Sequence, residues 1–216
     1  MRIAACIILS LVLSAAVVNA ELGFDLSAFV GNVDCFEDIV KAGYKFMIIE
    51  IQSSKKNFNY EIVHNTLAAR KAGINDIDVY LFPDKEKTAD QQISYALNYL
   101  KSNGVQFNSF WLDIEDEPHW FDTCEENIKF LQDMIDTASK FLKPEQIGLY
   151  ASARYWSPIM CNTTQFSNYK LWWPRYDNQT SFDSYQPFGG WDLPVMKQHM
   201  GTTNISCTDI DTDWRP

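Results

Sequence analysis

Several residue types and motifs that mark other classes of protein are scarce or missing in this sequence of 216 residues. It has three widely separated histidines and no Cys-x-x-Cys pair, so we expect no built-in metal site. A Gly-x4-Gly-Lys-Ser/Thr loop, a Gly-x-Gly-x-x-Gly fingerprint and a Gly-x-Ser-x-Gly elbow are all missing. The simplest signatures of nucleotide binding and of serine hydrolases are therefore excluded, and no cofactor is expected.

Positive charge is also scarce. The chain has 18 Lys and Arg against 28 Asp and Glu, which gives a formal net charge of −10. Proteins that follow nucleic-acid phosphates or dock on anionic membranes need a basic surface. We therefore expect neither nucleic acid nor a membrane surface as a partner. Hydrophobic residues make up 46% of the chain, enough for one folded domain, which we expect to be a monomer.

The first twenty residues have the features of a secretory signal peptide. A single basic residue, Arg2, precedes an apolar stretch over 3–18, and a Val-x-Ala sequence ends at Ala20. An uncleaved membrane anchor is the alternative interpretation. We predict a signal peptide over 1–20, a mature domain over 21–216, and a location outside the cell or in the lumen of lysosome-related or gut vesicles.

Cysteines and glycosylation motifs suit the same oxidising compartment. Four cysteines follow the predicted leader and allow three pairings: Cys35, Cys124, Cys161 and Cys207. Three Asn-x-Ser/Thr motifs, which are acceptor sites for N-glycosylation, begin at Asn162, Asn178 and Asn204.

Short β-rich runs alternate with longer amphipathic runs, which predicts βα units around a parallel sheet. Strands are expected at 22–26, 44–51, 77–82, 110–115, 147–151, 169–173 and 194–200, and helices at 34–42, 60–72, 88–102 and 124–141. Five βα units followed by a strand-rich closure predict an α/β fold of the modified TIM-like barrel type. A doubly wound open sheet is the alternative, because periodicity does not report closure.

The segment 110–118 is the most informative for chemistry, because an apolar run ends there in a cluster of acids. Asp113 and Glu115 are two residues apart, so in a strand they face the same side at a separation of about 7 Å. Each charge disfavours ionisation of the other, which keeps one carboxyl protonated as an acid. Glycoside hydrolysis needs such a division of labour. A solvated acidic turn is the alternative, but Trp111 and the strand-end position favour a site.

Further acids lie near both ends of the predicted mature chain. Asp25 ends the first predicted strand, where it is either a site residue or the N-cap of the following turn. The segment 208–213 holds three more aspartates, which are either site residues or a surface charge run.

Landmarks along the whole mature chain resemble the glycoside hydrolase family 25 lysozymes, above all the Entamoeba-type lysozymes of nematodes. They lie at 23–27, 46–49, 79–82, 111–115, 147–150, 171–176, 198 and 208–211. The most specific is the Asp-x-Glu sequence that ends a strand, combined with Asp25 on the first strand. The resemblance implies a barrel of five βα units plus three strands. It also implies a secreted enzyme that cleaves the β-1,4 bond between N-acetylmuramic acid and N-acetylglucosamine in bacterial peptidoglycan, for defence or digestion.

The resemblance also assigns roles to individual residues. Glu115 matches the general acid, Asp113 its partner carboxylate and Asp25 the first-strand acid. Asp209 matches the late acid near the rim, although Asp211 matches after a small register shift. Tyr80, Tyr150 and Tyr176 fall on aromatic positions that line the saccharide groove.

The sequence departs from the family pattern in two places. Over 50–54 it reads Glu-Ile-Gln-Ser-Ser, where many members carry a basic residue and an Ala-Thr-Glu sequence, and Leu81 replaces a common histidine. In the mechanism that the resemblance implies, Asp113 and Asp25 would stabilise positive charge or orient the N-acetyl group of the substrate as an internal nucleophile, and the sequence leaves both routes open.

The alternative function is a secreted barrel that binds glycans without cutting them.

Barrel closure makes a prediction for the disulfides. In a closed barrel the first and last strands are neighbours, as are the two strands that precede Cys124 and Cys161. A bridge requires Cα atoms closer than about 7 Å. We therefore predict the pairs Cys35–Cys207 and Cys124–Cys161.

Overall fold

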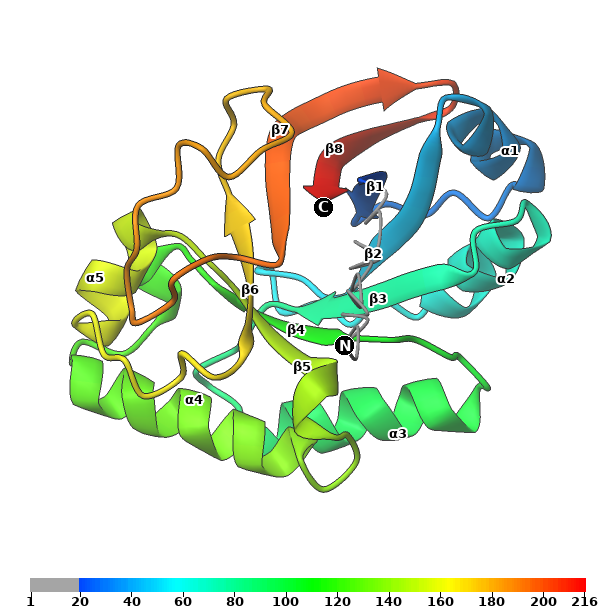
Figure 1. Ribbon diagram of the computed structural model, residues 1–216. Helices are drawn as coiled ribbons and strands as arrows, with labels where there is room; N and C mark the ends of the chain where they lie inside the picture. Colours follow the sequence, from blue (N-terminus) through cyan, green and yellow to red (C-terminus); the bar gives the residue numbers. More distant parts are fainter. Residues whose placement is uncertain (1–19) are drawn as a thin grey trace, which may run out of the picture.

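The computed structural model describes residues 20–216, which form a closed barrel of eight strands in chain order (Figure 1). The strands are β1 (Glu21–Leu26), β2 (Tyr44–Gln52), β3 (Asp76–Leu81), β4 (Phe110–Ile114), β5 (Ile147–Ala151), β6 (Lys170–Pro174), β7 (Met196–Ile205) and β8 (Thr208–Arg215). Strands β1 to β7 pair in parallel, whereas β8 runs antiparallel to both β7 and β1. The predicted barrel is confirmed and the open sheet is wrong. The predicted signal peptide lies outside the described residues, apart from Ala20.

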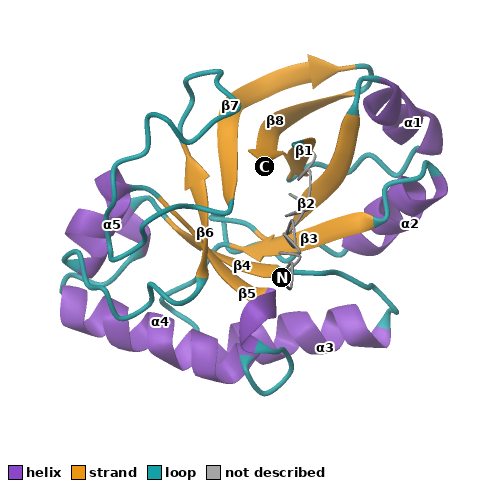
Figure 2. Cartoon of the chain, viewed as in Figure 1, coloured by secondary structure: helices purple, strands orange, loops and turns teal. Residues whose placement is uncertain are grey.

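The helices surround the first five strands. They are α1 (Val33–Lys41), α2 (Ile62–Lys71), α3 (Tyr95–Ser102), α4 (Cys124–Ala138) and α5 (Ala153–Met160), and a π-helical turn (Asp90–Ser94) leads into α3. After α5, the chain has no further helix within the described residues, and Figure 2 shows that loops join α5 to β6 and the last three strands to one another. Among residues 20–216, no helix has the length and apolarity needed to cross a membrane.

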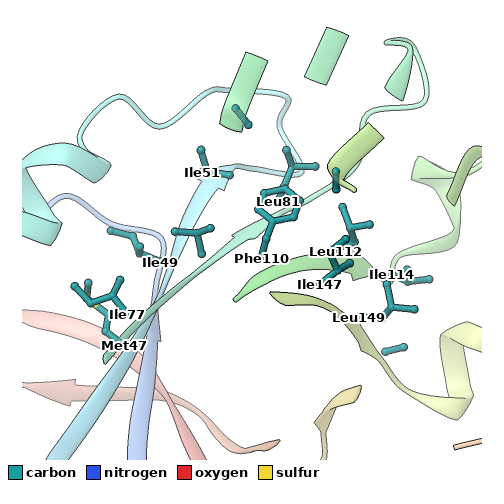
Figure 3. Close-up of a cluster of buried hydrophobic side chains, with 14 of the residues drawn as sticks. Met47, Ile49, Ile51, Ile77, Leu81, Phe110, Leu112, Ile114, Ile147 and Leu149 are labelled. Atoms are coloured by element: carbon teal, nitrogen blue, oxygen red, sulfur yellow. The ribbon is translucent and has the colours of Figure 1, made fainter. Parts of the chain in front are cut away.

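Both faces of the parallel strands are buried, which explains their unbroken apolar runs. Successive side chains of a strand point to opposite faces, so alternate residues of β2 to β5 pack outward against the helices (Figure 3). The other residues fill the barrel interior: Phe46, Ile48, Trp111, Tyr150, Trp172 and Met196. Gly148 makes room for this filling, since a Cβ atom there would lie 2.3 Å from the Trp111 ring. The lower barrel is therefore a packed core, and space is left only at its mouth.

The last strand was not predicted from the periodicity. The final predicted strand, 194–200, is the first part of β7, which continues to Ile205 and forms a hairpin with β8. Strand β8 alternates Thr and Ile with Asp up to Asp213, so its acids resemble a surface charge run. In the structure Asp213 is fully buried inside the barrel, where its Oδ1 accepts a hydrogen bond of 2.8 Å from Trp172 Nε1.

Both predicted disulfides are present. The Cα atoms are 5.9 Å apart in Cys35–Cys207 and 5.8 Å apart in Cys124–Cys161. Cys207 lies in the turn between β7 and β8 rather than after the last strand. The first bridge therefore fastens this hairpin to α1, and the second joins α4 to the end of α5.

Candidate active site

The mouth of the barrel holds a cavity of about 120 Å³ at the carboxyl ends of the parallel strands. Its lining residues are Asp25, Tyr80, Asp113, Glu115, Tyr150, Trp172, Tyr176, Gln198 and Asp211. We call this cavity the acid pocket. The structure thus brings together every site residue that the sequence analysis named, except Asp209.

Strand geometry explains this convergence. Asp25, Tyr80, Asp113 and Tyr150 are each the second-to-last residue of their strand. In a closed barrel, inward-facing residues at equivalent positions form one layer, here the layer at the mouth. Glu115 follows β4 directly, two residues after Asp113. Its turn is fixed by Trp120, whose Nε1 donates a 2.9 Å hydrogen bond to the Glu115 carbonyl oxygen.

The two acids of β4 differ in their exposure to solvent. Asp113 is only 7% exposed, and its Oδ1 has no hydrogen-bond partner among the described residues. Glu115 is half-buried and lines both the acid pocket and the wider cavity beside it. Glu115 can therefore reach a bound ligand from the rim, whereas Asp113 faces it from below.

Burial shifts the pKa of these acids upward. Loss of solvent raises the pKa of Glu115 to about 7, and the charges of Asp116 and Asp211 add to the effect. Burial, and then repulsion by Glu115 and Asp25, raise the pKa of Asp113 well above its ordinary value. The pocket therefore keeps protons on carboxyl groups close to neutral pH, as a general acid requires.

Asp25 is held by an amide at the centre of the pocket. Burial and the Asp211 charge raise the pKa of Asp25 to about 7, against the opposing hydrogen bond from Gln198. Gln198 Nε2 donates to Asp25 Oδ2 at 2.6 Å and to Asp211 Oδ2 at 3.3 Å. Its Oε1 accepts hydrogen bonds from the hydroxyl groups of Tyr150 at 2.7 Å and Tyr176 at 2.8 Å. All four hydrogen-bonding positions of this buried amide are used.

Two tyrosines enclose the pocket at different depths. Tyr150 is buried, and its ring centroid lies 4.6 Å from that of Trp172 in an edge-to-face arrangement. Tyr176, in the loop after β6, is 61% exposed and lines both cavities. The pair therefore offers one fixed aromatic wall and one at the solvent boundary.

The structure places Asp209 away from the pocket and Asp211 in it. Asp25 pairs with Asp211 in the register of β1 and β8, so Asp209 lies two residues beyond the end of that pairing. Asp209 is exposed and accepts a 2.9 Å hydrogen bond from Asn204 Nδ2 within the hairpin. All aspartates of β8 share one face, but only Asp211 lies level with the mouth.

Sequence reasoning assigned no role to Trp172 and Gln198, which line the acid pocket, or to Glu50, which is hydrogen-bonded to the pocket residue Tyr80. Gln198 was only a landmark of the family resemblance, although it is two residues after the interior residue Met196. Glu50 was only part of a stretch that departs from the family pattern. Burial raises its pKa to about 7, while the Tyr80 hydroxyl donates a 3.3 Å hydrogen bond to its Oε2. Glu50 and Gln198 each continue the period-two alternation of interior residues along their strands, β2 and β7. This alternation could have identified both as residues that face the barrel interior.

No group of three or more His, Cys, Asp or Glu within residues 20–216 is placed to hold a metal ion. The residues that line the acid pocket offer proton transfer and charge stabilisation by carboxyl groups, with aromatic rings and one amide around them. Hydrolysis of a glycosidic bond commonly uses a pair of such carboxyl groups.

Comparison with known proteins points to the same chemistry. A family model described as "Lysozyme-like protein 1" matches residues 16–199. The chain is 33% identical over 201 residues to "Probable GH family 25 lysozyme 2" of Dictyostelium discoideum, covering 93% of each chain. It is 32% identical over 214 residues to "Lysozyme-like protein 5" of Caenorhabditis elegans, covering 96% of this chain and 98% of the relative. The muramidase structure from Acremonium alcalophilum superposes with a TM-score of 0.70 at 19% identity, covering 91% and 93% of the two chains.

Proposed function

The chain belongs to the glycoside hydrolase family 25 lysozymes, and from this premise we propose that it is a muramidase acting on bacterial peptidoglycan. The bond cleaved is the β-1,4 bond between N-acetylmuramic acid and N-acetylglucosamine. The observation that carries the proposal is the convergence of Asp25, Asp113 and Glu115 on one pocket at the barrel mouth. A barrel that only bound glycans would not need buried carboxyl groups with raised pKa values.

Glu115 is the proton donor in this proposal. Its pKa of about 7 keeps the carboxyl protonated in mildly acidic solution. The proton passes to the glycosidic oxygen as the bond from this oxygen to the anomeric carbon breaks, and the leaving sugar departs as an alcohol. The position of Glu115 between the two cavities suits a donor that acts on a bond spanning both.

Asp113 and Asp25 act on the sugar that becomes positively charged. In one route they stabilise the positive charge directly; in the other they orient the N-acetyl group, whose carbonyl oxygen bonds to the anomeric carbon before water opens the ring. A thiazoline analogue of the N-acetyl intermediate separates the routes. Inhibition well below the substrate KM supports the internal nucleophile, and absence of inhibition supports direct stabilisation.

Action outside the cell is part of the proposal. The leader sequence supports it, and so do two disulfides, which persist in oxidising compartments. The acceptor residues of all three glycosylation motifs, Asn162, Asn178 and Asn204, are exposed. Defence against bacteria and digestion of bacteria are both consistent with such a location.

Release of reducing ends from purified peptidoglycan tests the proposal, with Glu115→Gln as the matched inactive variant. We expect reducing ends to accumulate with the wild-type protein and not with the variant. If both proteins bind peptidoglycan equally and neither releases reducing ends, the protein is the glycan-binding barrel instead.

A further inference from the structure

Two arginines line a second cavity, of about 560 Å³, that adjoins the acid pocket. Glu115, Tyr150 and Tyr176 line both cavities, so the two adjoin at these residues. Arg154, in the first turn of α5, and Arg175, in the loop after β6, line the second cavity but not the acid pocket. Arg154 also lines a third cavity, beside Asp116 and Glu117. We call these two residues the arginine pair.

The guanidinium groups of the arginine pair are largely free of protein acceptors. Within residues 20–216, Arg154 has no hydrogen bond or ion pair, and its only specific contact is with the ring of Tyr155, 5.4 Å away. Arg175 Nε lies 3.8 Å from Asp177 Oδ2. That carboxylate is already bound by Lys197 Nζ at 2.6 Å and by the Ser184 hydroxyl at 2.8 Å.

The other arginines of the described chain differ from the arginine pair. Arg70 donates to the carbonyl oxygens of Asn75 and Gln106, and Arg215 donates to the carboxylates of Glu21 and Asp76. Those two side chains therefore tie the fold together. The arginine pair instead presents exposed guanidinium groups, each with five N–H donors, to a cavity beside the catalytic acid.

We propose that the arginine pair is a carboxylate-binding subsite that recognises the acidic side chain of N-acetylmuramic acid. The inference rests on the proposed function and names the feature of the substrate that it selects. Each muramic acid carries a lactyl group whose carboxyl is free or continues into a peptide with carboxylates of its own. The planar guanidinium fork matches a carboxylate in geometry and charge.

Electrostatics explains why such a subsite is needed. The chain carries a formal net charge of −10, and Asp177 adds a carboxylate to the lining of the second cavity itself. This field repels an anionic glycan on approach. Two cations beside Glu115 offset the repulsion at the point where the muramyl residue must be placed. A neutral glycan such as chitin gains nothing from them.

Kinetics with the double variant Arg154→Gln/Arg175→Gln tests the inference. Because each lost charge-assisted hydrogen bond weakens binding about tenfold or more, we expect KM for peptidoglycan to rise at least about tenfold and kcat to change little. The matched control is Lys101→Gln/Lys140→Gln, which removes the same charge from two exposed residues that line a different cavity. An equal rise in KM in the control would show a general charge effect and overturn the subsite.

Binding to the inactive Glu115→Gln protein tests the subsite without turnover. The three ligands are a peptide-free muramyl oligosaccharide, its peptide-bearing form and a chitin oligosaccharide of the same length. We expect muramyl ligands to bind about tenfold more tightly than chitin, and the preference to vanish when the arginine pair is also replaced. If replacement of the arginine pair weakens binding of the peptide-free ligand, the group recognised is the lactyl carboxylate. If it weakens binding of the peptide-bearing ligand alone, the group recognised is a peptide carboxylate.

The two hypotheses fail in different ways. If the wild-type protein cleaves peptidoglycan and replacement of the arginine pair leaves both KM and ligand preference unchanged, the subsite is wrong and the muramidase stands. If the wild-type protein cleaves nothing but the binding preference depends on the arginine pair, the subsite stands and the proposed function is wrong.

Discussion

The five βα units over 21–160 and the closing part over 161–216 contribute differently to the site. The units are regular, and they place Asp25, Asp113 and Glu115 at or just beyond strand ends. The closing part has three strands joined by a long loop and a hairpin, and it supplies Gln198 and Asp211. The reactive acids thus come from the repeating architecture, whereas the groups that hold Asp25 come from the irregular part.

Replacement of the proton donor should have the largest effect. Because a general acid contributes about 10²- to 10⁴-fold, Glu115→Gln should lower kcat by about that factor without unfolding the protein. Asp113→Asn, in the same strand unit, should also be severely impaired. The matched control is Glu117→Gln, an exposed acid two residues further along the chain, which should remain near wild type. Equal losses in all three variants would indicate a general electrostatic effect rather than distinct roles.

The disulfides should show how strongly the closing part depends on the βα units. Cys35–Cys207 joins the two regions across 172 residues, whereas Cys124–Cys161 spans 37. Each double Cys→Ser variant should lose about 2–4 kcal/mol in free energy of unfolding. The variant without Cys35–Cys207, which closes the longer loop, should lose about 1 kcal/mol more than the variant without Cys124–Cys161. Urea unfolding of the two variants measures the difference. A larger loss of stability in the variant without Cys124–Cys161 would contradict the expectation.

Gln198 tests whether the closing part acts through the acids of the βα units. Gln198→Leu removes the hydrogen bond to Asp25, so kcat should fall about 10- to 100-fold. That hydrogen bond lowers the pKa of Asp25, so its loss should raise this pKa and move the acidic limb of the pH profile upward. Gln106→Leu, an exposed control, should shift neither quantity. A loss of activity with an unchanged pH profile would mean that Gln198 is only structural.

The pH dependence of activity should follow the Glu115 pKa of about 7. The protonated form is the active acid, so the rate should fall about tenfold per pH unit above that value. A pH profile of kcat for the wild-type protein measures this limb. A rate that rises continuously through pH 8 would contradict the assignment.

The contribution of Glu115 to the stability of the folded protein, like the activity, should fall as pH rises. A raised carboxyl pKa means that the folded state favours the proton. This stabilisation is fully present below the unfolded pKa, near 4.5 for Glu115, and is lost as pH rises through about 7. The Tm of Glu115→Gln relative to wild type should therefore increase between pH 4.5 and pH 7. A constant difference would contradict the shift.

The smallest expected effect separates two acids of the same strand. Asp211→Asn should lower kcat/KM about 2- to 10-fold, because Asp211 lines the acid pocket and accepts a hydrogen bond from Gln198. Asp209→Asn should change it less than about twofold, because Asp209 contacts only the hairpin. The reverse order would mean that the register of β8 differs from the one described.

Periodicity predicted the βα units well because their strands are buried on both faces and their helices are amphipathic. It missed β8, since Asp213 is polar yet lies inside the barrel, where Trp172 Nε1 donates a hydrogen bond to one of its oxygens. The site residues divide in a similar way between the reactive acids of the βα units, which the sequence predicted, and Gln198 of the closing part, to which it assigned no role. Asp113 and Glu115 were recognisable from local spacing alone, whereas the role of Gln198 depends on β7 lying beside Asp25, 173 residues away along the chain. The period-two alternation of β7 indicates that Gln198 faces the barrel interior, but no local pattern identifies a partner so far away in the sequence.

Identification of the new reducing end tests the central claim most directly. Peptidoglycan digested by the wild-type protein is reduced with borohydride, and the sugar alcohols are identified, with Glu115→Gln as the blank. Cleavage by Glu115 at the proposed bond predicts muraminitol at the new ends, well above the blank. Glucosaminitol alone, or no sugar alcohol above the blank, would contradict the account.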